Sequence, residues 1–220
     1  MHGLTQLLLA DGRFPSGGYA HSGGLEAACH DGLGADDVAA YVRARLYAVA
    51  AADCALAVAA SRETSVDPLL LLDEEATARV PSQALRAASQ RLGSQLLRTA
   101  SATWPDAALP RAYRVASTST PRPVAFGVVA RAAGLDELEL ARVFLYDDAA
   151  AVAAAAVKLL PVDVLSTTRL LAELEDEVEK VALAAVALDL PPRELPSAFA
   201  PLYELRSLAH ARREGRLFAS

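Results

Sequence analysis

The stretch DDVAAYVRARLYAVAAADCALAVAAS, residues 36–61, indicates most clearly which class of fold this chain adopts. Its larger apolar side chains recur at steps of three and four residues, namely Val38, Tyr41, Val42, Leu46, Val49 and Leu56. That spacing places them on one face of an α-helix. The alanines that fill most of the remaining positions are strong helix formers. The stretch therefore predicts a long helix with one buried face.

Apolar periodicity and the residues that interrupt it predict further helices over residues 83–103, 123–133, 136–160, 166–190 and 197–213. Gly134 suits the position just after a helix, and Ser166 is a candidate N-cap. Residues 12–24 contain too many glycines for a helix, and residues 113–117 could form a short extended segment. The chain is predicted to be all-α, with residues 1–220 forming a single-domain bundle of roughly eight to ten helices.

Composition and charge exclude several classes of protein. The chain has 220 residues, of which 53% are hydrophobic, enough for a real core. Its 21 basic and 27 acidic residues give a net charge of −6, which argues against nucleic acid as the main partner. No uncharged apolar run approaches the roughly 20 residues that cross a bilayer, so no membrane segment is predicted. Cys29 and Cys54 are predicted to be buried thiols in a reducing cytoplasm.

Common catalytic and metal motifs are missing from the sequence. It contains no phosphate-binding P-loop, so the chain is not predicted to be a P-loop nucleotidase, and it has no CxxC, HExxH, GxSxG or EF-hand pattern. Cys29 and His30 are adjacent, but neighbours on a helix point about 100° apart, which favours a structural role over a shared metal site. The acidic run over residues 173–179 is interpreted as a solvated helix face, and no metal site is predicted.

The segment DGRFPSGGYAHSGGLE, residues 11–26, is the most informative part of the chain. It is predicted to be a Gly-rich N-terminal loop between two helical stretches. In one interpretation it is a tight turn in which Ser22 caps the next helix and Glu26 lies in the first turn. In the other it is a contact surface, because Phe14, Tyr19 and His21 are costly residues to place in an ordinary linker. The residues alone favour neither interpretation.

The C-terminus is the second unusual segment. His210, Arg212, Arg213 and Arg216 form a basic cluster in an acidic protein, and LFAS follows at residues 217–220. A flexible tail is the usual structure of a chain end. Arginine beside exposed Leu and Phe is also typical of a peptide that docks into a partner's groove.

Together these two ends resemble the UreF family of urease accessory proteins. The resemblance begins with FPSGGYAHSGGLE at residues 14–26 and continues in order along the chain, through QALR at 83–86, LGSQLLR at 92–98, VAFG at 124–127, Gly134-Leu135, AAVKLLP at 155–161, His210 and RLFAS at 216–220. Three departures mark a divergent branch. The usual His is missing near residue 120, residues 162–166 lack the usual polar turn, and Ala211 replaces a Glu.

The resemblance implies an all-α, cytoplasmic and non-catalytic protein that is required for urease maturation. It implies a homodimer that bridges UreD, also called UreH, and the GTPase UreG. It also implies that the complex docks on apo-urease and inserts nickel into the active site, so that nickel is handled by the complex and no cofactor is bound stably.

The resemblance also implies roles for individual residues. Tyr19 and Arg216 are expected to form a pair that shapes the surface for the GTPase, and Leu217, Phe218 and Ser220 are expected to order only when UreD binds. The residues expected to bind partners are Tyr19, His21, Ser22, Glu26, Arg98, Lys158, His210, Arg216, Leu217, Phe218 and Ser220. The residues expected to shape the loop are Phe14, Pro15, Gly17, Gly24 and Leu25, and Glu26 and Lys158 are also polar candidates for a channel.

Three alternatives remain open at this point. The chain could regulate the GTPase, with Arg98 or Arg216 acting as an arginine finger. It could carry metal directly through His21, Cys29, His30 and His210. It could also be a helical scaffold unrelated to urease.

Overall fold

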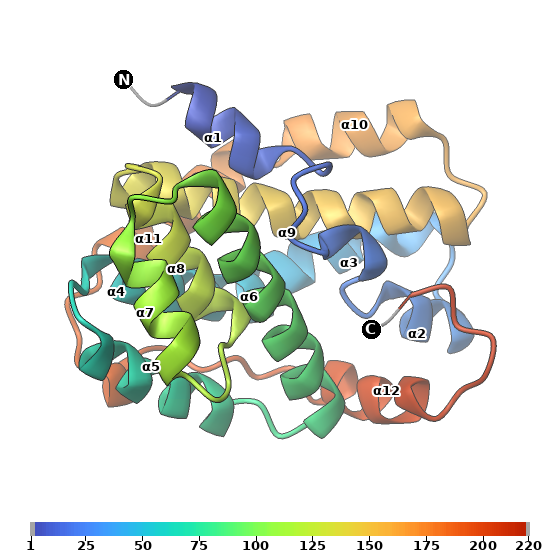
Figure 1. Ribbon diagram of the computed structural model, residues 1–220. Helices are drawn as coiled ribbons and strands as arrows, with labels where there is room; N and C mark the ends of the chain where they lie inside the picture. Colours follow the sequence, from blue (N-terminus) through green and yellow to red (C-terminus); the bar gives the residue numbers. More distant parts are fainter. Residues whose placement is uncertain (1–2, 219–220) are drawn as a thin grey trace.

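The computed structural model describes residues 3–218, and all the regular structure in that range is helical (Figure 1). The predicted all-α fold is therefore confirmed. The helices are α1 (Gly3–Ala10), α2 (Leu25–His30), α3 (Val38–Arg45), α4 (Ala51–Arg62), α5 (Val66–Ala78), α6 (Gln83–Thr103), α7 (Ala108–Ala116), α8 (Arg122–Ala132), α9 (Glu137–Leu159), α10 (Val164–Glu173), α11 (Glu175–Val186) and α12 (Pro201–Ala211). Short helical turns cover Gly18–Ala20, Ala35–Asp37 and Pro192–Glu194, and a π-helical turn at Leu46–Ala50 joins α3 to α4.

The core lies where α8 packs against α4 and α6, with α9 packed against α4. Gly127 of α8 faces α4 so closely that a Cβ atom there would lie 2.1 Å from the carbonyl oxygen of Ala57. Phe126 and Phe144 meet edge to face, with ring centroids 5.1 Å apart. Small residues on these helices therefore permit the close approach that a dense core requires.

The strongest periodic segments form the predicted helices. The helix predicted over residues 36–61 occupies 35–62, and α6 begins and ends where the sequence predicts. Asp136 caps α9, since its side chain accepts a hydrogen bond from the backbone N–H of Glu139 at 2.8 Å. The 35–62 run is long and apolar enough to cross a membrane by composition, but 56% of its most apolar window is buried inside the protein. Such burial is typical of a core helix.

Two predictions in the second half of the chain are wrong. Asp163, not Ser166, caps α10, and its carboxylate accepts the backbone N–H of Leu165 at 2.6 Å. The helix predicted over residues 166–190 is interrupted at Leu174, which is 1% exposed. Both α10 and α11 pack along α9, and the change of direction at Leu174 lets each present its apolar face to that helix.

The extended segment predicted at residues 113–117 is also wrong, because most of it belongs to α7. Tyr113 is fully buried and its hydroxyl donates a hydrogen bond to Asp73 of α5. Burial of this amphipathic segment outweighs the modest strand preference of Tyr and Val. The last helix begins at Pro201 and not at Ser197, since proline favours the first position of a helix.

Candidate functional site

The Gly-rich N-terminal segment and the C-terminal tail meet at one place. Glu26, in the first turn of α2, is 3% exposed. Its carboxylate accepts hydrogen bonds from the backbone N–H groups of Leu217, at 2.8 Å, and Phe218, at 3.0 Å. The chain after α12 therefore turns back and brings the tail, as far as Phe218, close to α2 (Figure 1).

Three further side chains complete this contact. The Phe218 ring is 5% exposed, and the Lys158 ammonium of α9 lies 5.3 Å from its centroid. The buried His210 Nε2 lies 3.5 Å from the Glu26 carboxylate and 3.4 Å from the Phe218 carbonyl oxygen. Burial of a Phe side chain contributes about 1.5–3 kcal/mol to stability. We call Glu26, Lys158, His210 and Phe218 the tail clasp.

The tail clasp corrects the expectation that the C-terminal tail is flexible and orders only on a partner. Phe218 is already buried in this chain, because Glu26 satisfies two of the tail's backbone donors and Lys158 covers the ring. Leu217, in contrast, is 71% exposed and remains available to a partner. Ser220 lies outside the described residues.

The glycines of the N-terminal loop allow α12 to approach. Gly24 has φ +83°, and a Cβ atom there would lie 2.4 Å from the Tyr203 ring. The Tyr41 hydroxyl donates a hydrogen bond to the carbonyl oxygen of Gly23 at 2.9 Å. Gly24, and not Ser22 as predicted, is the N-cap residue of α2. The hydroxyl of the fully buried Ser22 still accepts the backbone N–H of Glu26 at 3.3 Å. The loop is thus both a tight turn and one wall of the site.

The start of the loop is anchored on α6. Phe14 is buried and its ring centroid lies 6.3 Å from that of Trp104. The Pro15 carbonyl oxygen accepts hydrogen bonds from Gln95, at 3.0 Å, and from Thr99, at 2.7 Å. These contacts hold the loop in one conformation, which limits the entropy that a partner must remove on binding.

A surface hollow of about 230 Å³ adjoins the tail clasp and is lined in part by Tyr19, His21, Tyr146, Lys158 and Phe218. Tyr19 is 73% exposed at its edge. The expected pairing of Tyr19 with Arg216 is not formed in residues 3–218, since both side chains are exposed and no hydrogen bond or cation–π contact joins them. The Glu26 carboxylate instead accepts the backbone N–H of Leu217, the residue after Arg216, and the Arg216 side chain is exposed.

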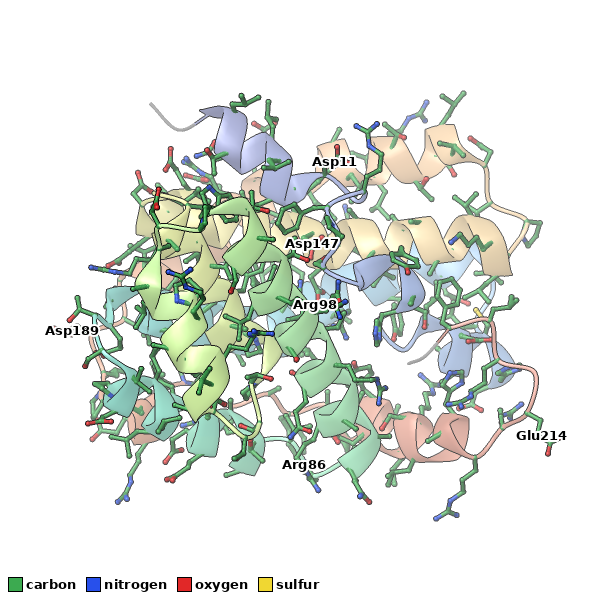
Figure 2. The ribbon with its side chains drawn as sticks, in the orientation of Figure 1. Asp11, Arg86, Arg98, Asp147, Asp189 and Glu214 are labelled. Carbon is green, nitrogen blue, oxygen red and sulfur yellow. The ribbon has the colours of Figure 1, made fainter. Side chains whose placement is uncertain are left out.

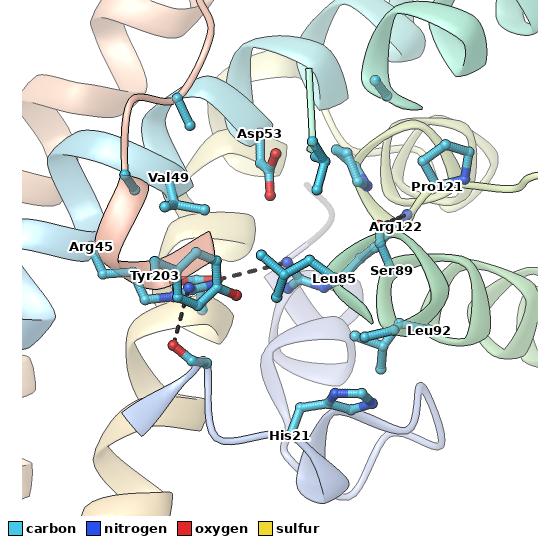
Figure 3. A pocket seen from close by; sticks show the side chains of 18 of the residues that line it. His21, Arg45, Val49, Asp53, Leu85, Ser89, Leu92, Pro121, Arg122 and Tyr203 are labelled. Atoms are coloured by element: carbon cyan, nitrogen blue, oxygen red, sulfur yellow. Dashed lines mark hydrogen bonds and ion pairs between the residues drawn. The ribbon is translucent and has the colours of Figure 1, made fainter. Parts of the chain in front are cut away.

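A second cavity, of about 130 Å³, lies between the loop and helices α3, α4, α6, α8, α9 and α12 (Figure 3). Arg45 forms a bidentate ion pair with Asp148, with both N–O distances 2.8 Å, and its guanidinium lies 5.1 Å from the Tyr203 ring centroid. Arg122 pairs with Asp147 at 2.6 Å. Burial favours the neutral acid of Asp148, but Arg45 and Arg122 outweigh it and hold the pKa of that carboxyl below its usual value.

Asp53 and His21 lie at opposite ends of this cavity, at the top and bottom of Figure 3. Burial raises the pKa of Asp53 to about 6, with Arg122 opposing the shift. Burial also lowers the pKa of His21 to about 4, and the charges of Arg91 and Arg122 add to the effect. At neutral pH, His21 is therefore neutral and Asp53 is ionised at an energetic cost.

Apart from His21, sequence reasoning did not identify the charged residues of this cavity. One signal in the sequence could have pointed to this cavity, namely charged residues within helices that are otherwise rich in Ala and Leu. These residues are Arg45, Asp53 and Asp148. Such residues are seldom buried unless they are paired. Within residues 3–218, no group of three His, Cys, Asp or Glu side chains has an arrangement that could hold a metal ion. Arg98 lies elsewhere, exposed on α6 (Figure 2).

Comparisons with known proteins agree with the motifs at the two ends. The family model for UreF matches residues 33–175. A protein of Mycobacterium sp. strain JLS named urease accessory protein UreF is 38% identical, and the match covers 98% of each chain. Proteins with the same name from Mycolicibacterium vanbaalenii and Mycobacterium marinum are 33% and 34% identical, over 98% and 97% of each chain.

Proposed function

This chain belongs to the UreF family of urease accessory proteins, and we propose that it serves urease maturation as a non-catalytic scaffold between UreD, also called UreH, and the GTPase UreG. In this proposal the complex docks on apo-urease in the cytoplasm. Nickel is its cargo, and this chain binds no cofactor stably.

The tail clasp is the observation that supports a scaffold most strongly. It joins the two motifs that carry the family resemblance, although they lie at opposite ends of the chain. Around the clasp, Tyr19 and Leu217 are 73% and 71% exposed, and Arg216 is exposed between the clasp and solvent. Aromatic and arginine side chains presented on a rigid base are typical of a contact surface.

Apolar residues elsewhere provide surface for additional partners. Leu202 and Leu205 of α12 are each 64% exposed, and Leu4 and Leu7 of α1 are 83% and 69% exposed. A homodimer, which the resemblance implies, would cover part of this apolar surface. Large exposed apolar groups on a folded protein commonly mark such contacts.

A capture experiment tests the scaffold. The purified chain is immobilised and offered UreD, then GTP-loaded UreG, and the retained protein is quantified. Arg216→Ala is expected to retain UreD but lose UreG, while Arg169→Ala, an exposed arginine on α10, retains both. Normal retention of UreG by the Arg216 variant would contradict the role assigned to the clasp surface.

Regulation of the GTPase is the alternative that Arg98 and Arg216 support, since both side chains are exposed. An arginine finger accelerates GTP hydrolysis by about 10³–10⁵. Steady-state GTP turnover by UreG, measured with and without this chain, distinguishes the two functions. A pure scaffold leaves the turnover rate unchanged.

A further inference from the structure

A basic surface groove of about 680 Å³ lies between α6 and the loop that joins α7 to α8. Arg91 and Arg98 extend from α6, Arg114 from α7, and hydroxyl groups of residues 118–120 line the other wall. We call this the arginine groove. It involves none of the tail clasp residues, and Figure 2 shows Arg98 on α6, well separated from the tail residue Glu214.

The charges of the arginine groove are not neutralised. Arg91, Arg98 and Arg114 are exposed, and none of them forms an ion pair within the described part of the chain. The residues that line the groove, so far as the structure describes them, include no Asp or Glu. Within the described residues these three guanidinium groups have no carboxylate partner, although Arg98 donates a hydrogen bond to the Gln95 side chain. In a protein of net charge −6 they form a local positive potential that attracts anions.

The wall of the groove is held rigidly. The Ser117 hydroxyl accepts the backbone N–H of Thr120 at 2.8 Å and donates to the buried Asp73. Thr120 has φ +40°, an uncommon conformation for a residue other than glycine. Its carbonyl oxygen lies so close to α6 that a Cβ atom on Gly93 would be 2.0 Å away. Backbone strain of this kind persists only where the surroundings enforce it, and it is concentrated at functional sites.

We propose that the arginine groove binds an acidic segment of a partner protein through two or more carboxylates. Arg91 and Arg98 are seven residues apart on one helix face, a separation of about 10 Å along the axis. That distance exceeds the size of one phosphate. It suits carboxylates about two helical turns apart on a peptide, or about three residues apart in an extended segment. Guanidinium forks bind carboxylates bidentately. The groove's described lining has no aromatic side chain on which a nucleotide base could stack.

The test uses the purified full chain alone, so its result is independent of the proposed roles of UreD and UreG. A fluorescently labelled peptide with Glu at every third position and Ser between is titrated, and its anisotropy is recorded at low and high salt. The variant Arg98→Glu/Arg114→Glu is expected to weaken binding at least roughly tenfold, as two exposed ion pairs are replaced by repulsion. Arg98→Glu alone is compared with Arg169→Glu, which makes the same charge change on exposed α10.

Three results would overturn the proposal. The first is absence of peptide binding to the wild-type chain at low salt. The second is equal weakening by Arg98→Glu and Arg169→Glu, which would indicate attraction to overall charge. The third is competition by pyrophosphate at the concentration at which unlabelled peptide competes, which would indicate a site for small anions. Thermal unfolding of each variant confirms that it is folded.

Discussion

The carboxylate of Glu26 accepts the backbone N–H of Phe218 at 3.0 Å, across 192 positions of the sequence. A second oxygen of the same carboxylate accepts the N–H of Leu217. A buried carboxylate that satisfies two backbone donors acts as a fixed cap for the tail. In the proposed function, the surface around the tail clasp is therefore already formed before a partner binds.

Glu26→Ala is expected to release the tail. Hydrogen bonds to a charged group contribute about 1.5–3 kcal/mol each to stability. Removal of the Glu26 carboxylate takes away the acceptor of the Leu217 and Phe218 amides, which then become exposed to solvent. Hydrogen exchange read by mass spectrometry on the C-terminal peptide should show loss of protection. Glu214→Ala, an exposed residue of the same tail, is the matched control. Unchanged protection in the Glu26 variant would mean that other contacts hold the tail.

Arg45→Ala is expected to reduce the free energy of unfolding by about 3–5 kcal/mol, because it leaves the Asp148 carboxylate buried without its main partner. Urea denaturation measures the change. Arg142→Ala removes a bidentate pair with Glu179 that is largely exposed, and a loss of at most about 1 kcal/mol is expected there. Equal losses in the two variants would show that the Arg45 pair is not effectively buried.

Asp53 gives the stability of this chain a specific pH dependence. Its pKa is about 6 in the folded chain, above its ordinary value of 3.8, so the folded state binds the proton more tightly than the unfolded state does. The contribution of Asp53 to stability is therefore present below about pH 4 and is lost as the pH rises through 6. The difference in unfolding free energy between Asp53→Asn and wild type should shift in favour of the variant by about 1–3 kcal/mol when the pH is raised from 4 to 8.

Unfolding free energies of wild type and variant at the two pH values measure this difference directly, since all other titrating groups cancel. The exposed Asp106→Asn serves as the control. A difference between wild type and Asp53→Asn that does not change with pH would contradict the burial of this carboxyl.

Gly93→Ala should destabilise the chain by about 1–3 kcal/mol, because its Cβ atom would meet the backbone of Thr120 and not a movable side chain. The melting temperature measures the change. Gly12→Ala is the control, because no atom lies within 4 Å of the added carbon. If both variants melted alike, the loop would be free to move away from α6.

The sequence predicted the long helices well, because their apolar periods and end residues act locally. The residues that bound α6 and α9 can be recognised from the sequence. Asp136, for example, is the N-cap at which α9 begins. α5 was not predicted, and α7 was mistaken for an extended segment, because the burial of Tyr113 against Asp73 is a tertiary effect.

The candidate site was predicted only in part, for the same reason. Motif resemblance identified Glu26, His210 and Phe218, but it could not show that they contact one another. The pairing of Arg45 with Asp148 joins residues 103 positions apart, and no local pattern specifies such a partner. The order of the tail likewise depends on a buried carboxylate far away in sequence.

Light scattering coupled to size-exclusion chromatography tests the scaffold most directly. The chain is examined alone, with UreD, and with UreD plus GTP-loaded UreG, each for wild type and for Glu26→Ala. Wild type is predicted to form a ternary complex with UreD and UreG. In Glu26→Ala, where the tail is released, UreD or UreG is predicted to be absent from the complex. A chain that elutes separately from both proteins, or a complex unaffected by Glu26→Ala, would contradict the account.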